Sequence, residues 1–178
     1  PKKLMTSDLM VGVNRTLCDV TRAEQFVTLM LAVIDSRAGT LTYTNAGHPP
    51  PLLLRDGEWT SLKSHGLFLG VAPEAVYTTT TWNLSKGDVL VLFTDGVTET
   101  MSPSRVVFRR QGIKATIPAV NHADADSIAE TIWQGLEQHD PGRPEVQRAP
   151  HPQALRGLRP HDRRHRGVAD RVQQREQV

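Results

Sequence analysis

The deciding stretch of the chain reads Asp88-Val-Leu-Val-Leu-Phe-Thr-Asp95-Gly96-Val-Thr-Glu99. Its run of consecutive apolar residues, 89–93, follows turn-forming residues and predicts a short strand that is covered on both faces. Asp95 comes where this strand ends, and Gly96 allows the backbone a sharp change of direction there. Carboxylates at strand ends are common ligands of Mg²⁺ and Mn²⁺, although Asp-Gly is also an ordinary turn dipeptide. The pattern therefore indicates a candidate metal ligand at Asp95.

Length and composition fit one ordinary domain. The chain has 178 residues, of which 38% are apolar, and this is enough for a sizeable core. It contains no apolar run long enough for a membrane span. The N-terminal residues show neither a signal-peptide pattern nor an initiator methionine, so we interpret Pro1 as an internal start. The single cysteine, Cys18, excludes an internal disulfide framework and favours a reducing, cytoplasmic location.

The net charge of +2 conceals a difference between two parts of the chain. Residues 141–178 contain nine Arg, no Lys and four acidic residues, whereas residues 1–140 contain 12 basic and 15 acidic residues. The basic character therefore belongs to the last segment, and it does not indicate that the folded part binds nucleic acid. The last segment also has no aromatic residue and no sustained periodicity. We expect it to be disordered, because it can bury too little apolar surface to offset its conformational entropy.

Two amphipathic helices are predicted. The first covers residues 4–18, and the second covers residues 124–138 with Asp124 or Asp126 as its cap. The apolar face of the first helix is expected to consist of Met5, Leu9, Val13 and Leu17, which are spaced four residues apart. Met10 is expected to widen this face.

Between these helices the sequence has the pattern of an antiparallel sheet. Short apolar or alternating segments are separated by turn-forming residues, and this spacing favours hairpins over alternating βα units. Strands are predicted at residues 26–34, 40–44, 52–54, 58–62, 76–82 and 89–94. The overall prediction is an α+β fold.

A proline-rich bend follows the strand predicted at residues 40–44, and it reads Asn45-Ala-Gly-His48-Pro-Pro-Pro51. Consecutive prolines cannot donate hydrogen bonds to a ladder, so strand pairing is expected to stop there. His48 has the chemistry of a general acid or a metal ligand, but a structural role in the bend is the favoured interpretation. Asn45 and Gly47 are expected to serve the same turn.

Two motifs with matching order and spacing identify a resemblance to a known family. They are Gly39-Thr-Leu-Thr-Tyr-Thr-Asn-Ala-Gly-His-Pro-Pro50 and Phe93-Thr-Asp-Gly-Val-Thr-Glu99, accompanied by Phe26-Val-Thr-Leu and Gly87-Asp-Val-Leu. Over residues 4–140 the chain resembles the SpoIIE/RsbU-type branch of the PPM (protein phosphatase 2C-like) Ser/Thr phosphatases. The pairing of two independent motifs makes the resemblance more specific than either motif alone.

The resemblance implies an αββα sandwich, here partial, with two antiparallel sheets flanked by helices. In the family, aspartates hold two Mn²⁺ or Mg²⁺ ions, and a metal-activated water attacks phosphoserine or phosphothreonine in line. Asp95 matches one metal ligand, while Gly96, Asn45, Gly47 and His48 are expected to shape the site. No residue is assigned a catalytic role. The substrates implied are phosphorylated regulatory proteins of bacterial sigma-factor switches, such as anti-anti-sigma factors.

The sequence departs from the family pattern at both ends. Members carry Gly-Asp-x-x-Asp and Asp-x-x-Gly-His-Gly segments before the first helix and end in Asp-Asp-x-Thr, and this chain has none of these motifs. We interpret residues 1–140 as a phosphatase domain truncated at its N-terminus, and a frameshifted origin of residues 141–178 is a hypothesis. One carboxylate does not hold two divalent cations, so little or no activity is expected of this chain alone. The alternative is a degenerate, non-catalytic module that docks a regulatory protein.

Overall fold

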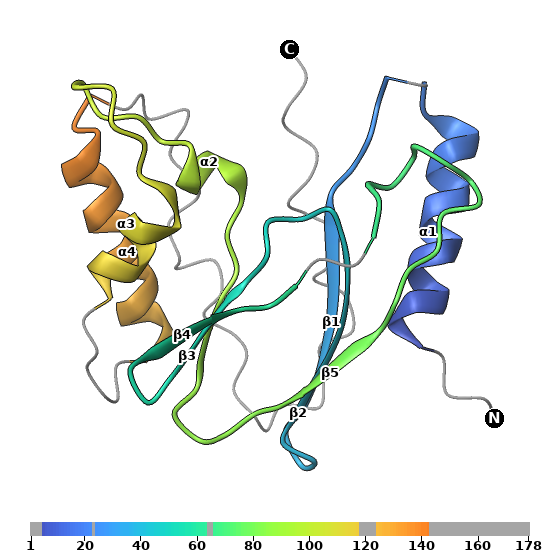
Figure 1. The fold of residues 1–178 in the computed structure, drawn as a ribbon, viewed down its shortest axis with the longest axis horizontal. Helices are drawn as coiled ribbons and strands as arrows, with labels where there is room; N and C mark the ends of the chain where they lie inside the picture. Colours follow the sequence, from blue (N-terminus) through green and yellow to red (C-terminus); the bar gives the residue numbers. More distant parts are fainter. Residues whose placement is uncertain (1–4, 23, 64–65, 118–123, 143–178) are drawn as a thin grey trace. The chain divides into compact units, whose positions relative to one another are not determined.

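The structure is a computed structural model that describes residues 5–22, 24–63, 66–117 and 124–142 (Figure 1). These residues belong to the first of two compact units of the chain, Pro1–Arg143. The helices among them are α1 (Thr6–Val20), α2 (Asp95–Thr98), α3 (Arg109–Thr116) and α4 (Ala125–His139). The strands are β1 (Leu29–Asp35), β2 (Thr40–Ala46), β3 (Leu52–Arg55), β4 (Glu58–Ser61), β5 (Thr80–Asn83) and β6 (Val89–Val91).

The described strands make two antiparallel sheets of three strands each. The first sheet has the order β1-β2-β5, and the second has the order β4-β3-β6. β1 and β2 form a long hairpin in which Leu29 pairs with Ala46. β3 and β4 are joined by Asp56 and Gly57, whose φ angles of +49° and +83° suit the tight primed turns of hairpins. The antiparallel pairing confirms the prediction of an α+β fold.

The two sheets meet through one cluster of buried side chains. β2 contributes Leu41 and Tyr43, β3 contributes Leu53, and Leu62 follows β4. None of these four side chains is more than 2% exposed. Burial of apolar surface of this kind contributes about 1.5 to 3 kcal/mol for each large side chain, so the contact between the sheets is a substantial part of the core.

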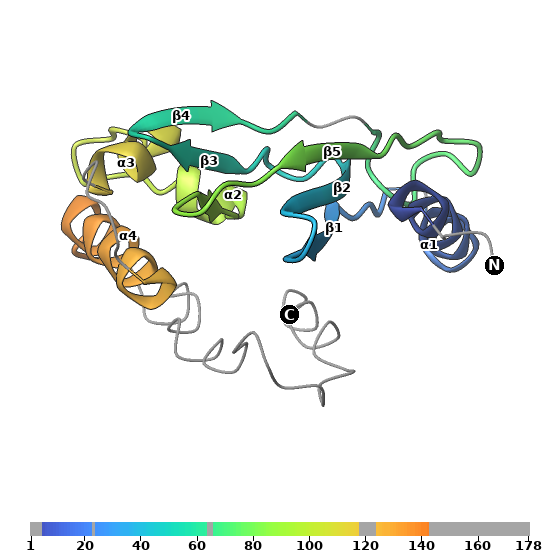
Figure 2. The ribbon, with the colours of Figure 1, turned by 90° about the horizontal axis from the view of Figure 1, so that it is seen from below.

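Helices α3 and α4 cover the other face of the second sheet. Because side chains alternate along a strand, Leu52 and Leu54 of β3 point away from Leu53. They pack in a cluster that includes Ile113 of α3 and Leu136 of α4. Figure 2 shows both helices lying beside β3 and β4. A continuous leucine run is therefore buried on both of its faces.

Helix α1 covers the first sheet and contacts β1 and β2. Met10, at the centre of the contact, packs in a cluster with Ala46, Leu69 and Tyr77. With α1 on one sheet and α3 and α4 on the other, the layers follow the helix, sheet, sheet, helix order. This arrangement confirms the predicted partial αββα sandwich.

The predicted core-facing side of α1 is confirmed for Met10 and Leu17, which pack in the core, and is wrong for the other three residues. Met5, Leu9 and Val13 are 41 to 43% exposed, whereas the helix buries Thr6, Met10 and Asn14. The helix is thus rotated by about one residue, or roughly 100°, from the orientation that the apolar spacing predicts. It can turn this way because its buried polar groups have partners in the rest of the fold.

Those partners lie far away in the sequence. The Thr6 hydroxyl lies 2.8 Å from that of Thr44 and 3.0 Å from that of Thr79. The Asn14 amide nitrogen donates to the carbonyl of Ala72 at 2.8 Å, and its oxygen accepts from the N–H of Gly70 at 2.9 Å. Buried polar groups that are hydrogen-bonded in this way cost little, and so the helix face can be polar.

Several predicted strands are shorter in the structure. β1 begins at Leu29 rather than at residue 26, and β5 begins at Thr80 rather than at residue 76. β6 ends at Val91, and the side chain of Leu92 is 51% exposed. The prediction of a strand over residues 89–94 that is covered on both faces is therefore wrong, because the Phe93 side stays buried at 7% exposure while the Leu92 side is open.

The second long helix is confirmed at Ala125–His139. Asp124 caps it, since its carboxylate accepts hydrogen bonds from the backbone N–H and the hydroxyl of Ser127, each at 3.0 Å. These hydrogen bonds lower the pKa of Asp124. The short helices α2 and α3 were not predicted. α3 buries Ile113 alone, so it has no apolar periodicity to indicate it.

In the described part of the chain, every helix is too short or too polar to cross a membrane. The expected disorder and the suggested frameshift concern residues 141–178, of which residues 143–178 lie outside the described ranges.

Candidate active site around Asp95 and His48

Asp95 is the first residue of α2, which directly follows the second sheet's last strand. Its side chain is exposed. One carboxylate oxygen accepts the N–H of Gly96 at 2.9 Å, and its backbone carbonyl accepts the N–H of Glu99 at 2.7 Å. The short helix thus orients the Asp95 side chain at the rim of the sheet while leaving it accessible to a ligand.

Gly96 does not make the sharp turn expected of it. It lies inside α2, and its φ is not positive. The chain changes direction through a helical turn, which any residue can form, so the glycine is not required for its conformational freedom. A Cβ at position 96 would lie 3.6 Å from the Thr94 hydroxyl oxygen, which is ordinary contact.

The Asn45–His48 bend is held by a buried amide. The Asn45 side chain is fully buried. Its oxygen accepts the N–H of His48 at 2.8 Å, and its nitrogen donates to the carbonyl of His48 at 3.0 Å. Gly47 has a φ of +70°, and a Cβ there would overlap the ring of Phe68. The bend therefore requires both the amide and the glycine.

The imidazole of His48 lies between two parts of the fold. Its Nδ1 is 3.2 Å from the hydroxyl of Thr28, at the entrance to β1. The ring also has a hydrogen bond to the backbone of Phe93 and lies close enough to Asp95 to sense its charge. Burial lowers the pKa of His48, against the smaller raising effects of Asp95 and Phe93. His48 is therefore mainly neutral near neutral pH.

The structure thus brings the two sequence motifs into one place. His48 from the bend after β2 lies against the segment from Phe93 to Asp95, although the two motifs are far apart in the sequence. Asn45 and Gly47 act on this place indirectly, by fixing the position of His48. Thr28, which contacts His48, was not expected at the site, although it belongs to the Phe26-Val-Thr-Leu segment that accompanies the two motifs.

The described residues do not complete a site for two divalent cations. Among residues 5–22, 24–63, 66–117 and 124–142, no group of three or more His, Cys, Asp or Glu side chains is close enough to bind one metal ion. A dense set of oxygen ligands is needed for Mg²⁺ or Mn²⁺, and Asp95 supplies one carboxylate. The described residues therefore fit one ligand position and not a complete two-ion centre, and no hydrolytic step is assigned to them.

Asp88, at the start of the deciding stretch, has a structural role. Its carboxylate accepts hydrogen bonds from the Arg55 guanidinium at 2.6 and 2.9 Å and from the N–H of Ser85 at 2.8 Å. Hydrogen bonding to Arg55 is the main reason why the pKa of Asp88 is lowered. This ion pair fastens the loop before β6 to the end of β3, and so it supports the strand that leads to Asp95.

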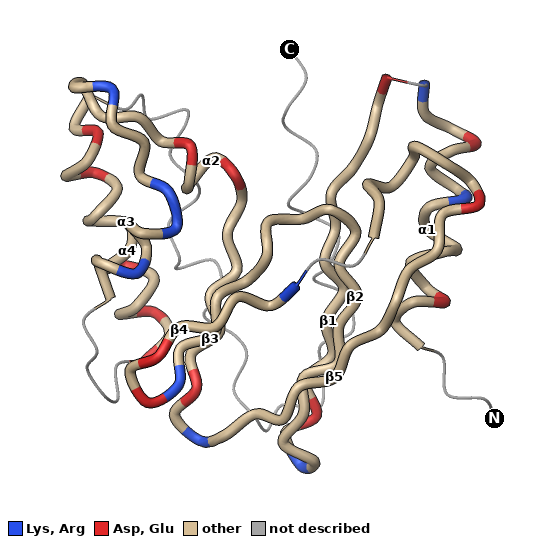
Figure 3. The backbone as a smooth tube through the Cα atoms, viewed as in Figure 1, with Lys and Arg blue, Asp and Glu red and all other residues tan. Residues whose placement is uncertain are grey.

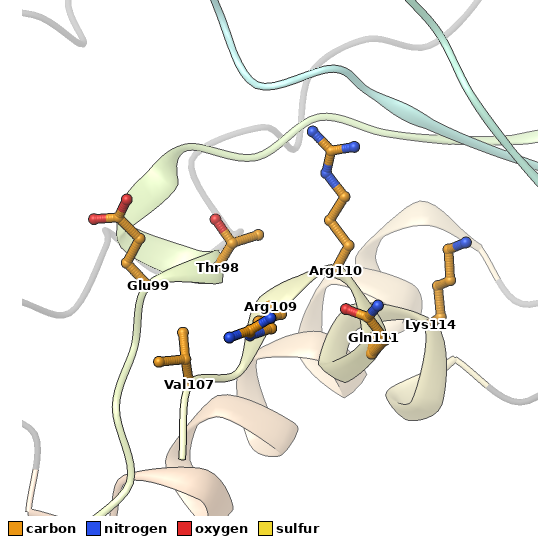
Figure 4. Close-up of a pocket in the computed structure, with 7 residues that line it drawn as sticks. All are labelled: Thr98, Glu99, Val107, Arg109, Arg110, Gln111 and Lys114. Atoms are coloured by element: carbon orange, nitrogen blue, oxygen red, sulfur yellow. The ribbon is translucent and has the colours of Figure 1, made fainter. Parts of the chain in front are cut away.

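A basic cavity lies beside α2 and was not predicted from the sequence. Its volume is about 610 Å³ (Figure 4). Thr98 and Glu99 line it on the α2 side, and Val107 lies before α3. α3 contributes the basic side chains Arg109, Arg110 and Lys114, together with Gln111. The signal in the sequence is the pair Arg109-Arg110 followed by Lys114, which is cationic on successive turns of a helix.

The family model described as Stage II sporulation protein E (SpoIIE) matches residues 2–145. Phosphoserine phosphatase RsbU of Bacillus subtilis is 34% identical over 132 residues, which are 73% of this chain and 39% of the relative. Protein IcfG of Synechocystis is 37% identical over 118 residues, which are 66% of this chain and 18% of the relative. The chain therefore spans well under half the length of either relative.

A solved structure has the same fold. It contains the PP2C phosphatase domain and a fragment of the regulatory domain of SpoIIE from Bacillus subtilis, and it superposes with a TM-score of 0.67 at 20% identity. The match covers 79% of this chain and 41% of that one.

Proposed function

Because this chain belongs to the SpoIIE family of PPM-type protein phosphatases, we propose that it is a metal-dependent serine/threonine phosphatase domain of bacterial sigma-factor regulation. The resemblance found in the sequence is confirmed by the family match, and the family's members are hydrolases. The proposed substrate is a phosphorylated regulatory protein of the anti-anti-sigma type, and the proposed location is the cytoplasm. We further propose a domain boundary near residue 140, between the phosphatase domain and the Arg-rich segment.

The proposal is supported most directly by the contact between the two motifs. Asp95 stands exposed at the end of the sheet, and the neutral ring of His48 lies beside it. We assign Asp95 one metal-ligand position, where bound Mn²⁺ or Mg²⁺ would activate water and neutralise charge on the phosphoryl oxygens. Asn45, Gly47 and His48 position the neighbouring backbone, and Gly96 orients the Asp95 carboxylate through its N–H.

We propose that the chain alone has little or no turnover. A two-ion centre needs more oxygen ligands than the single carboxylate that the described residues place here. The test is phosphate release from a phosphoserine peptide in Mn²⁺, measured for the parent chain and for Asp95→Asn. Equal background rates are expected. Turnover that Asp95→Asn abolishes would contradict the proposed inactivity and support a working metal site.

The second candidate is a non-catalytic module that docks a regulatory protein, and the single carboxylate is the observation that favours it. A chimera separates the two candidates: the family's Gly-Asp-x-x-Asp and Asp-x-x-Gly-His-Gly segments are joined ahead of α1, and its Asp-Asp-x-Thr segment replaces residues 141–178. Turnover in the chimera that Asp95→Asn removes supports the phosphatase. A chimera that folds and binds Mn²⁺ without turnover supports the docking module.

A further inference from the structure

The cations of the basic cavity have no ion-pair partner among the described residues. The described residues form an ion pair between Arg55 and Asp88. Arg109, Arg110 and Lys114 form no ion pair with any described residue. Arg110 makes one weak contact, from its guanidinium to the hydroxyl of Ser61 at 3.4 Å. Figure 3 shows Lys and Arg gathered along α3. The cations are therefore available to an anionic ligand.

The charge of the cavity is of one predominant sign. Glu99 is the one acidic residue among those that line it, and three of the other lining residues are cationic. Figure 4 shows the Glu99 side chain on the far side of the cavity from Lys114. Opposite charge raises both the affinity and the association rate of a partner, so an acidic ligand is favoured and a basic one is excluded.

The spacing of two of the cations suits an extended peptide. Arg110 and Lys114 are four residues apart on α3, and their side chains project in the same direction (Figure 4). Their separation along the helix axis is about 6 Å. Alternate residues of an extended chain lie on one face and are about 7 Å apart. Carboxylates on alternate residues of a peptide therefore match this pair.

The cavity also lies close to Asp95. Asp95 and Thr98 are the two ends of α2, and Thr98 lines the cavity. This distance is about 5 Å along the helix, or roughly one to two residues of an extended peptide. One short peptide segment is therefore long enough to reach from the cavity to Asp95.

We propose that the basic cavity binds an extended acidic segment of the protein substrate, with carboxylates on alternate residues next to the phosphorylated residue. The inference rests on the proposed function for the identity of the partner. Arg110 and Lys114 bind successive carboxylates, and Arg109 adds to the local positive potential. The cavity thus selects substrates by the residues that flank the phosphorylation site.

The test is peptide binding by the whole chain, measured by fluorescence anisotropy at low salt. One labelled peptide carries an unphosphorylated serine with glutamates on alternate residues beside it, and its partner carries glutamines at the same places. The acidic peptide is expected to bind more tightly, and Arg110→Gln with Lys114→Gln is expected to weaken it by about threefold to tenfold. The glutamine peptide should be unaffected by these substitutions.

Two further variants separate charge from folding. Arg109→Gly removes a cation where φ is +56°, a conformation that glycine favours, so weaker binding there does not come from unfolding. Arg37→Gln removes an exposed cation from the β1–β2 turn, and it should bind like the parent. The Arg-rich segment is the same in all variants, so its contribution is constant.

The inference is overturned if the double variant binds the acidic peptide as tightly as the parent, or if Arg37→Gln weakens binding equally. The peptides carry no phosphate, so this result does not depend on turnover. A chimera without phosphatase activity would count against the proposed function, but it would not affect the difference in peptide binding. An active chimera whose parent chain binds the acidic and glutamine peptides equally would count against the inference alone.

Discussion

The side chain of Asn45 holds the backbone of His48 on both sides, accepting from its N–H at 2.8 Å and donating to its carbonyl at 3.0 Å. Asn45 is fully buried, so water cannot replace these hydrogen bonds if the amide is removed. Together with the contacts of the His48 ring with Thr28 and Phe93, this arrangement places the imidazole near Asp95.

Asn45→Ala is expected to destabilise the chain by about 1 to 3 kcal/mol, because it leaves the N–H and carbonyl of His48 without their partners. Urea denaturation measures the change. Asn83→Ala is the control, since that side chain is exposed at the end of β5, and it should change stability by less than about 0.5 kcal/mol. Equal effects of the two substitutions would show that the amide does not hold the bend.

Gly47→Ala is expected to cost more stability than Gly57→Ala. Both glycines have positive φ, but a Cβ at position 57 meets open space, whereas one at position 47 overlaps Phe68. The common backbone cost is about 1 kcal/mol or somewhat more, and overlap adds about 1 to 3 kcal/mol. Urea denaturation of Gly47→Ala with Phe68→Ala should recover part of the difference. If the stability losses of Gly47→Ala and Phe68→Ala simply add in the double variant, the overlap between residue 47 and Phe68 is contradicted.

Met10→Ala and Leu9→Ala test the orientation of α1. Met10 is fully buried, so its truncation is expected to cost about 2 to 5 kcal/mol. Leu9 is 42% exposed, and its truncation should cost less than about 1 kcal/mol. Thermal or urea denaturation distinguishes them. The reverse order would support the orientation expected from the apolar spacing and contradict the structure.

Asp88→Asn should lower stability near pH 7 and have less effect near pH 3. Arg55 lowers the pKa of Asp88 in the folded state, so its contribution is complete above the unfolded pKa of about 3.9. This contribution is lost as the pH falls through the folded pKa, because the carboxyl is then neutral in both states. Urea midpoints of the parent and the variant across this range provide the measurement, and a constant difference would contradict the ion pair.

Local signals in the sequence predicted the elements whose structure depends on local contacts. The Asp124 cap, the turn at Asp56 and Gly57, and the alternation from Thr40 to Tyr43 in β2 are examples. The orientation of α1 could not be predicted, because the partners of Asn14 and Thr6 lie 38 to 73 residues away. The sequence pattern of the helix itself does not indicate those contacts.

The candidate site was predicted in part. The resemblance indicated Asp95, and the motifs indicated the bend, but their proximity depends on tertiary contacts of His48 with Thr28 and Phe93. The basic cavity was missed because α3 has one buried apolar residue and no periodicity. Its cations line a cavity only because the fold places α3 beside α2, and the sequence does not show this contact.

The electrostatic interaction between His48 and Asp95 is tested most directly by NMR titration of the His48 ring, assigned with His48→Gln, in the parent chain and in Asp95→Asn. Burial should hold the pKa of His48 below about 6.5 in the parent. Since the folded state favours the neutral ring, His48 also lowers stability as the pH falls below that value. Removing the Asp95 charge should lower the pKa of His48 further. An unchanged pKa in Asp95→Asn would contradict the proposal that the two motifs form one site.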